Sequence, residues 1–539
     1  MGWLPGRRGA WRRVCIPVAA VIVAARPAWG AGEGAQELLL GRFPPVVENG
    51  RLLAKVSLKD LLQLVMERNL ALQASQVSED AARQTLKAAQ ERLQPTFSSA
   101  LSSAKTISPF LSSTTATPSG SAFLFLSGVN TETLSAGVSQ QDWLGNTYSL
   151  TYSETSFQAY LGTLQRPGDT PVFASPSAFK DYSSLTGTVT IPLAQNFGRA
   201  FNRIPVGQAE VGVRSARLAT RKEQLTTLNA VAQAYWNLVG QLEIVGVNGE
   251  AVQLDQRLLS DNRVRLQAGT IAPADVLATE AQLAKDQFNL VQSRLQAFNL
   301  EDQLRQAIGL EAIDFGFKPV DVPEVRAAAY DPADQLARVY RNNPDLATLQ
   351  ENLESNAYDL LSAENSAKPQ LNLALSYMYN GYSKDPFVGS NYYGQTETQG
   401  YAATLNYSLP LFDRVGPANI QRRVLERQAI ELNIRDTRTS LNIQLQTALR
   451  NIQQAEEQEA AARTSVDLAR VQLKNEIDKL TQGRSTAFTV AQLQQQLALS
   501  EQLEIAARVQ FEQNDANRMS LTAELFDHYG LKTEAIDRP

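Results

Sequence analysis

The sequence predicts a mainly α-helical protein that also contributes strands to a membrane β-barrel, built as two copies of one unit. Three observations predict this fold class. Two distant segments repeat each other, long stretches without proline are helical over tens of residues, and short segments between prolines alternate apolar and polar side chains.

The duplication is visible without inserting a gap. Residues 60–95 and 334–369 align at an offset of 274. The matching positions are Asp60, Leu62, Val65, Asn69 and Pro95 in the first copy and Asp334, Leu336, Val339, Asn343 and Pro369 in the second. The offset then falls to 218 and 214, mainly because the segment between the prolines is longer in the first half. Each half therefore has the order helix, proline, variable segment, proline, long helix, glycine, helix. A period this long indicates a duplicated domain half rather than a solenoid.

The first 30 residues are typical of a secretory signal peptide. Four arginines precede the apolar run 14–25, and the small residues Ala28 and Gly30 follow at the expected cleavage positions. The only cysteine, Cys15, lies in that run without a lipoprotein context, so we expect a mature chain with no thiol and no lipid anchor. Removing the five arginines of this segment changes the formal net charge from −5 to −10, which argues against nucleic acid as a partner.

The helical segments are unusually long. Between Ala418 and Tyr529 the chain has no proline and a single glycine, Gly483. This pattern predicts two helical arms, 418–482 and 485–527. In the first half the corresponding arms are 205–268 and 273–308, separated at Gly269. An arm of about 63 residues is roughly 95 Å long.

Heptad spacing predicts the neighbours of these helices. One seam follows the first arm, and two adjacent seams follow the returning arm. Two adjacent seams favour a closed ring of helices over a simple antiparallel coiled coil. The seams are Leu225, Leu228, Ala232, Tyr235, Val239 and Leu242; Leu277, Ala281, Ala284, Phe288, Val291, Leu295 and Phe298; and Val276, Leu283, Leu290, Ala297 and Leu304.

The segments between the prolines have strand periodicity. Residues 371–379 and 401–409 alternate Leu or Tyr with small or polar residues over about nine positions, the length of a tilted membrane-spanning strand. A soluble sandwich would alternate in the same way. The signal peptide and the absence of a later 18-residue apolar run favour a β-barrel if the protein crosses a membrane.

The strand signal is weaker in the first half, over about 97–192. Residues 106–120 and 158–180 are rich in Ser, Thr, Pro and Gly and are expected to be loops, while 131–140 and 147–155 could form an additional hairpin. The chain would then supply four strands, or six with that hairpin. Neither number closes a membrane barrel, which needs about eight, so we expect an oligomer.

Proline marks the expected helix-to-strand transitions. It fixes φ, lacks the N–H that a continuing helix would use, and favours an extended preceding residue. The transition residues are Pro95, Pro192, Pro369 and Pro410.

The composition argues against an enzyme. The single histidine, His528, is near the C-terminus and the mature chain has no cysteine, so we expect no catalytic residue, no metal site and no cofactor. Two other classes remain as alternatives, a periplasmic adaptor and a structural coiled-coil protein of the cell envelope. Both leave the duplicated strand segments unexplained.

Three segments resemble the TolC-type outer-membrane efflux family: 56–72, 188–199 and above all 265–309. The resemblance covers most of residues 57–527. Its most specific part is Gly269–Ala284, which includes Asp275; the second copy, Gly483–Ala498, has Thr489 in place of the aspartate.

This resemblance implies a homotrimer whose outer-membrane β-barrel continues into a periplasmic α-helical barrel. It implies an exit duct of a tripartite efflux or type I secretion system, with a periplasmic adaptor (membrane fusion) protein, an inner-membrane transporter and outer-membrane lipid as partners. The implied divisions are a signal peptide 1–30, an equatorial segment 31–56, a first repeat 57–310, a linker 311–330, a second repeat 331–527 and a tail 528–539. Within the first repeat, helices 57–94 and 273–310 would stack end to end beside the long arm.

The resemblance also places the functional tips. Gly269 and Gly483 would turn the hairpins at the periplasmic end and contact the adaptor. The tyrosine, arginine and aspartate pattern that narrows the entrance in relatives is absent from the second hairpin. The remaining candidate gate residues are Asp261, Arg263, Arg265, Asp275, Asp478, Lys479 and Arg484, with Arg484 expected to pair with Asp275 or another acid.

Overall fold

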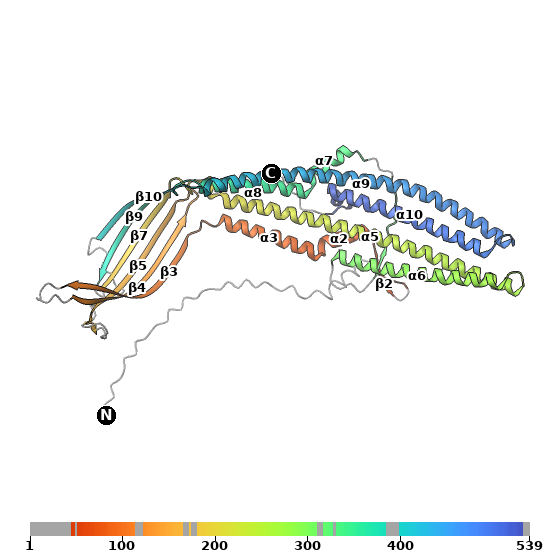
Figure 1. Cartoon of the computed structure of the whole chain (residues 1–539), viewed down its shortest axis with the longest axis horizontal. Helices are drawn as coiled ribbons and strands as arrows, with labels where there is room; N and C mark the ends of the chain where they lie inside the picture. The colour runs from red at the N-terminus through yellow and green to blue at the C-terminus, as the bar shows by residue number, and fades with distance from the viewer. Residues whose placement is uncertain are drawn as a thin grey trace, which may run out of the picture.

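The computed structural model describes residues 45–48, 51–113, 122–164, 172–173, 180–309, 316–326, 330–383 and 398–531. Long helices lie side by side along one axis, and a single large sheet stands at one end of them (Figure 1). The signal segment 1–30 with Cys15 and the last eight residues of the tail lie outside the described residues.

The elements follow the chain in this order: β1 (Pro45–Glu48), β2 (Arg51–Val56), α2 (Leu58–Arg68), α3 (Leu70–Gln90), β3 (Thr96–Ser113), β4 (Ala122–Gln141), β5 (Thr147–Leu164), β6 (Val172–Phe173), β7 (Lys180–Pro192), α4 (Arg199–Asn202), α5 (Ile204–Gln267), α6 (Pro273–Ile308), β8 (Gly316–Pro319), α7 (Pro332–Asn342), α8 (Pro344–Ser366), β9 (Gln370–Ser383), β10 (Thr398–Ser408), α9 (Val415–Thr481), α10 (Ala487–Thr522) and α11 (Leu525–Tyr529).

The four long helical arms agree with the sequence prediction to within a few residues at most ends. The exception is the last arm, which was expected to continue to 527 but ends at Thr522. Ala523 adopts a left-handed conformation with φ 59° and ends the helix, and the short α11 follows. The helices lie in the lateral order α6, α5, α10, α9 near the tips and α3, α5, α8, α9 nearer the sheet (Figure 1).

The helix expected over 57–94 is two helices. Asn69 separates α2 from α3, and its side-chain oxygen accepts hydrogen bonds from the backbone N–H groups of Ala71 and Leu72 at 2.9 and 3.1 Å. Asparagine is a strong N-cap, so this local bond competes successfully with helix continuation. The Leu70 N–H and the Asn69 amide donate to the carbonyls of Gly309 and Ile308. It is therefore α3 that stacks end to end on α6 beside α5.

The large sheet contains six long antiparallel strands in the order β10-β9-β7-β5-β4-β3, with the two-residue β6 beside β5. The additional hairpin joins the sheet as β4 and β5. The loop predictions were wrong for residues 106–113 and 158–164, which extend β3 and β5, and for residues 172–173 and 180, which belong to β6 and β7. Their serines and threonines signal loops locally, but each residue is paired across the ladder to a neighbouring strand. Pro109 is tolerated because β3 is an edge strand of this sheet.

One face of the sheet carries exposed apolar side chains. Cross-strand neighbours share a face of an antiparallel sheet. One such row is Phe97, Val138, Leu150, Gly187, Tyr377 and Tyr401, and its large members are exposed. Tyr401 has 90% of its surface accessible.

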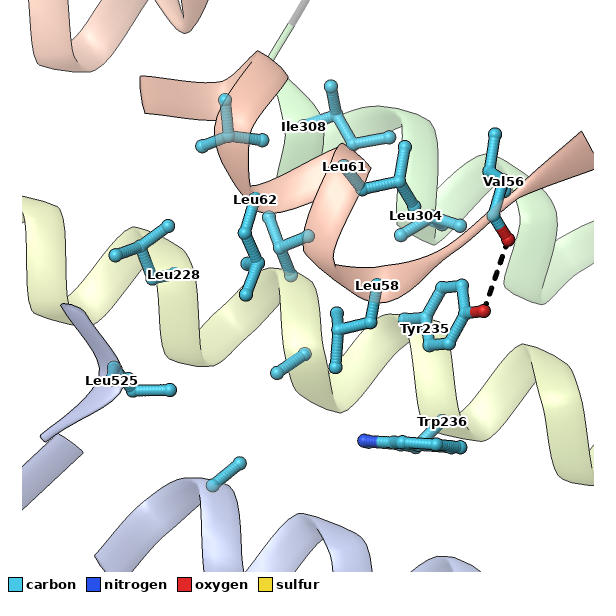
Figure 2. Close-up of a cluster of buried hydrophobic side chains, with 14 of the residues drawn as sticks. Val56, Leu58, Leu61, Leu62, Leu228, Tyr235, Trp236, Leu304, Ile308 and Leu525 are labelled. Atoms are coloured by element: carbon cyan, nitrogen blue, oxygen red, sulfur yellow. Dashed lines mark hydrogen bonds between the residues drawn. The ribbon is translucent and has the colours of Figure 1, made fainter. Parts of the chain in front are cut away.

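The largest core surrounds the middle of α5, where α2, the end of α6 and α11 converge (Figure 2). The Tyr235 hydroxyl is fully buried there and donates to the carbonyl of Val56 (3.2 Å) or to the Asp321 carboxylate (2.8 Å). Asp321 also accepts from the Leu58 N–H at 2.7 Å. These bonds attach the small β1-β2-β8 sheet and the start of α2 to the long helix.

Candidate functional site at the helical hairpin tips

The two hairpin turns are built in the same way. Gly269 and Gly483 have φ of 69° and 70°, a conformation that a β-carbon disfavours. The Gly269 N–H donates to the carbonyl of Leu266 and the Thr270 N–H to that of Arg265. The Gly483 and Arg484 N–H groups donate likewise to Leu480 and Lys479. Each arm thus ends in a Schellman motif, which satisfies its last carbonyls at an exposed turn.

The returning helices begin differently in the two hairpins. Pro273 opens α6, and the Asp275 carboxylate accepts from the Ala272 N–H at 3.2 Å. Thr486 caps α10 through its hydroxyl, which accepts from the Thr489 N–H at 3.3 Å. The second hairpin has Thr489 where the first has Asp275, and the side chain that caps the returning helix differs as well.

Several charged candidates are paired within the chain. Arg263 forms an ion pair with Glu280 across the first hairpin at 2.7 Å. Lys479 pairs with Glu476 at 2.9 Å. A hydrogen bond from Ser485, followed by the bond from Lys479, holds the pKa of Glu476 below its usual range.

One candidate connects the two hairpins. The Arg265 guanidinium donates to the carbonyl of Leu480 at 3.2 Å, so α5 and the end of α9 are joined at the tips. Below this contact, the Asn262 amide donates to the Thr279 hydroxyl at 2.9 Å in a buried position between α5 and α6. The tips of one chain form a connected unit.

The other candidates face solvent. Asp261, Asp478 and Arg484 are exposed, and no ion pair of theirs occurs within the part of the chain that the structure describes. Arg484 is not brought to Asp275 here, since the only bond of that carboxylate among the described residues is the helix cap. The expected pairing of Arg484 is thus absent within one chain.

Sequence reasoning missed Glu280, Glu476 and Asn262. The three-residue spacing of Glu476 and Lys479 on one helix could have indicated their ion pair. Glu280 and Asn262 act across the hairpin, so they could be found only once α5 and α6 were placed side by side.

The predicted transition prolines lie at element boundaries. Pro95 immediately precedes β3, Pro192 ends β7 and Pro369 immediately precedes β9. Pro410 stands between β10 and α9.

The two heptad seams predicted for the returning arm lie on α6. On α6 the line that begins at Val276 is buried or half-buried, with Ala297 and Leu304 at 6% and 0% exposure. The neighbouring seam is exposed, with Phe288, Val291 and Leu295 at 61%, 64% and 56%. One of the two seams is therefore used within the chain and the other is open.

The described helices include none that combines the length and apolar character needed to cross a membrane. In the same residues no group of three or more His, Cys, Asp and Glu side chains could hold a metal ion.

The chain matches the model of the outer membrane efflux protein family over residues 147–310 and 336–523, together more than half of its length. No curated protein sequence matches it.

Solved outer-membrane channels share its fold. The channel OprN is 14% identical, with a TM-score of 0.62 over 86% of this chain and 89% of its own. CmeC of Campylobacter jejuni is 13% identical, with a TM-score of 0.61 over 89% and 90%. VceC of Vibrio cholerae is 13% identical, with a TM-score of 0.59 over 86% and 95%.

The resemblance found in the sequence is confirmed, and with it an outer-membrane location and the role of an exit duct. The family is one of channels rather than enzymes. The chain belongs to the outer membrane efflux protein family.

Proposed function

We propose that three copies of the chain close into a homotrimer that forms one continuous duct through the outer membrane and the periplasm. Six long strands from each copy give a barrel of 18 strands, and the helices continue it as a second barrel. The observation that carries this proposal is that each chain has two different open edges.

The first edge consists of β3, α3 and α6, and the second consists of β10 and α9. Within the described residues neither β3 nor β10 has a strand on its outer side, so both offer unpaired backbone groups. A contact between two different edges is heterologous, and such contacts close into a ring when the rotation between copies suits.

Both edges also carry apolar side chains that need a partner. On the first edge Leu277, Phe288, Val291, Leu295 and Phe298 of α6 are exposed, as is Val77 of α3. On the second edge the exposed side chains belong to α9 and are Leu425, Leu432, Ile443, Leu468 and Val471. Packing the first stripe against the second removes both from water.

The exposed apolar face of the sheet suits outer-membrane lipid. Tyrosines such as Tyr377, Tyr401 and Tyr407 combine an apolar ring with a polar hydroxyl, which fits the membrane interface. The helical part, with its small equatorial sheet at the middle of α5, then extends into the periplasm.

The internal repeat gives each chain two hairpins, so the trimer would present six tips. Asn69 and Asn343 cap matching helices, α3 and α8, in the same way, which supports the two-fold repeat. We assign the tips at Gly269 and Gly483 to a periplasmic adaptor that joins the duct to an inner-membrane transporter.

The entrance gate is assigned to charged residues at the tips. Arg263, Arg265 and Lys479 already have partners within the chain, which leaves Arg484 to pair with an acid of a neighbouring copy, such as Asp261 or Asp478. An exposed ion pair contributes about 0 to 1 kcal/mol, so a ring of them closes the entrance weakly. Adaptor binding could then open it at small cost.

Photo-crosslinking tests the assignment of the tips. A photoreactive residue at exposed Ala268 or Gln482 leaves both turn glycines intact, and one at exposed Thr439, far along α9, is the matched control. The tip positions should capture a periplasmic protein with a long α-helical hairpin that copurifies with an inner-membrane transporter. Equal capture from Thr439, or no adaptor from either tip, would contradict the assignment.

A further inference from the structure

Two carboxyl groups meet between α5 and α6, about four turns above the first hairpin turn. Asp255 of α5 is 1% exposed, and its carboxyl is in hydrogen-bonding contact with that of Asp286 on α6. Gln494 of α10, 6% exposed, completes the site, bonding to Asp255 and donating to the carbonyl of Ala251 at 2.9 Å. Three helices therefore enclose this contact.

Asp286 already has a hydrogen-bond donor on each of its two oxygens. Its two oxygens accept hydrogen bonds from the side-chain amides of Gln282 at 2.9 Å and Asn289 at 3.2 Å.

One carboxyl oxygen of Asp255, in contrast, has no hydrogen-bond donor within the part of the chain that the structure describes. Its Oδ2 is buried and has no donor among the described residues, and the same holds for Oε1 of Gln494. Neither aspartate forms an ion pair with a lysine or arginine in the described chain. The nearby cation of α6, Lys285, reaches across to Gln495 of α10 instead.

Two carboxylates in contact repel unless something positive lies between them. A proton bound to the Asp255 carboxyl would give the contact between the two carboxyl groups the hydrogen-bond donor that it lacks, with the smallest change in the packing. Burial, then the hydrogen bond and charge of Asp286, raise the pKa of Asp255 to about 7.

The second hairpin shows that the fold does not need this pair. Asp255 and Asp286 stand 14 residues before and 17 after Gly269, and the same distances from Gly483 lead to Ala469 and Ser500. Both are buried, and the Ser500 hydroxyl lies 3.0 Å from that of Ser465. Small uncharged residues thus fill the matching place.

We propose that Asp255 and Asp286 form a proton-binding site that holds α6 against α5 in the periplasmic hairpin. With the proton bound, Asp255 donates to Asp286 and joins the two helices. When the proton leaves, two adjacent negative charges push the helices apart at this level.

The charged groups facing the site set the direction of the effect. From α6 these are Asp286 and Lys285, while α10 contributes the uncharged Gln494 and Gln495. Below neutral pH the protonated hairpin, with α6 held against α5, dominates. Above neutral pH the deprotonated hairpin, in which the two carboxylates repel each other, dominates. Since α6 is an outer edge of the chain, a change in its position alters the interface with the next copy, a consequence that rests on the proposed trimer.

Infrared spectra of the detergent-extracted full-length protein test the site. Between pH 5 and 9 the wild type should lose a protonated-carboxyl band with a midpoint near the pKa of about 7. The part of this band due to Asp255 should vanish in Asp255→Asn and persist in Asp261→Asn, an exposed aspartate on the same helix. Identical spectra in all three proteins would overturn the proposal.

A second measurement follows the helices themselves. Spin labels at exposed positions 257 on α5 and 287 on α6 should give a broader distance distribution at pH 9 than at pH 6, and Asp255→Asn should remove the difference. Asp286→Asn serves if the first variant does not fold. If calcium or magnesium at pH 6 abolishes the Asp255 band in the wild type, the site is a cation site and the proton proposal is wrong. The titration does not depend on oligomeric state, so its failure is distinct from failure of the trimer.

Discussion

Truncating the open seam of α6 should weaken assembly without unfolding the chain. The variant replaces Phe288, Val291 and Leu295 by alanine. In a single chain these side chains are 61%, 64% and 56% exposed, so most of their packing would have to come from a second copy. Alanine also keeps the helix propensity high.

The size of the effect follows from the exposed fractions. Full burial of a large apolar side chain contributes about 1.5 to 3 kcal/mol, so the fraction still open corresponds to about 1 to 2 kcal/mol for each residue. Three residues then contribute roughly 3 to 5 kcal/mol per interface, and three interfaces roughly 9 to 15 kcal/mol per trimer.

The assay is the temperature at which the detergent-extracted protein dissociates, followed by native mass spectrometry. Gln292→Ala with Gln296→Ala is the matched control, since both residues are exposed on α6 outside the seam. The triple variant should dissociate at a clearly lower temperature, while circular dichroism shows unchanged helix content. Equal dissociation temperatures would refute the assignment of α6 to the interface.

Three further predictions concern packing, pH and the gate. A β-carbon at Gly240 would lie 2.6 Å from Cγ2 of Val509, whereas a β-carbon at Gly246 would meet nothing within 4 Å. Gly240→Ala should therefore destabilise the fold by about 1 to 3 kcal/mol, and Gly246→Ala should stabilise it. Denaturant unfolding of the two variants measures both effects. Burial, together with the charges of Asp515 and Glu324, raises the pKa of Glu512 to about 7. The folded chain then binds the Glu512 proton more tightly than the unfolded chain does, so the stability of the fold should decrease as pH rises from about 4.5 to about 7. Glu512→Gln should make the thermal unfolding temperature less dependent on pH in that window, and an unaltered dependence would contradict the assignment. Arg484→Glu should raise single-channel conductance in planar bilayers, and high salt should partly reproduce the effect by screening; no change in either would mean that Arg484 does not hold the entrance closed.

The long helices could be predicted because their ends carry strong local signals. Gly269 and Gly483 adopt left-handed conformations, and Pro273 starts a helix, so the residue types alone locate these boundaries. The weaker signal of Asn69 was missed because asparagine is tolerated inside helices, and only the capping bonds to Ala71 and Leu72 reveal the break.

The rest depends on contacts between distant segments. The serine-rich start of β3 is a strand because it pairs with β4, a partner that local composition does not identify. The two seams of α6 were visible in the sequence, but only the packed chain shows which of them faces α5 and which is open. The contact of Asp255 with Asp286 likewise requires the register of α5 against α6.

Native mass spectrometry of the detergent-extracted protein would show whether the two unlike open edges of each chain close a ring of three chains. Three copies that each supply six long strands to a shared barrel should give one dominant species at three times the mass of the mature chain. A folded monomer stable in detergent, or a dominant species of any other number of chains, would contradict a ring of three chains.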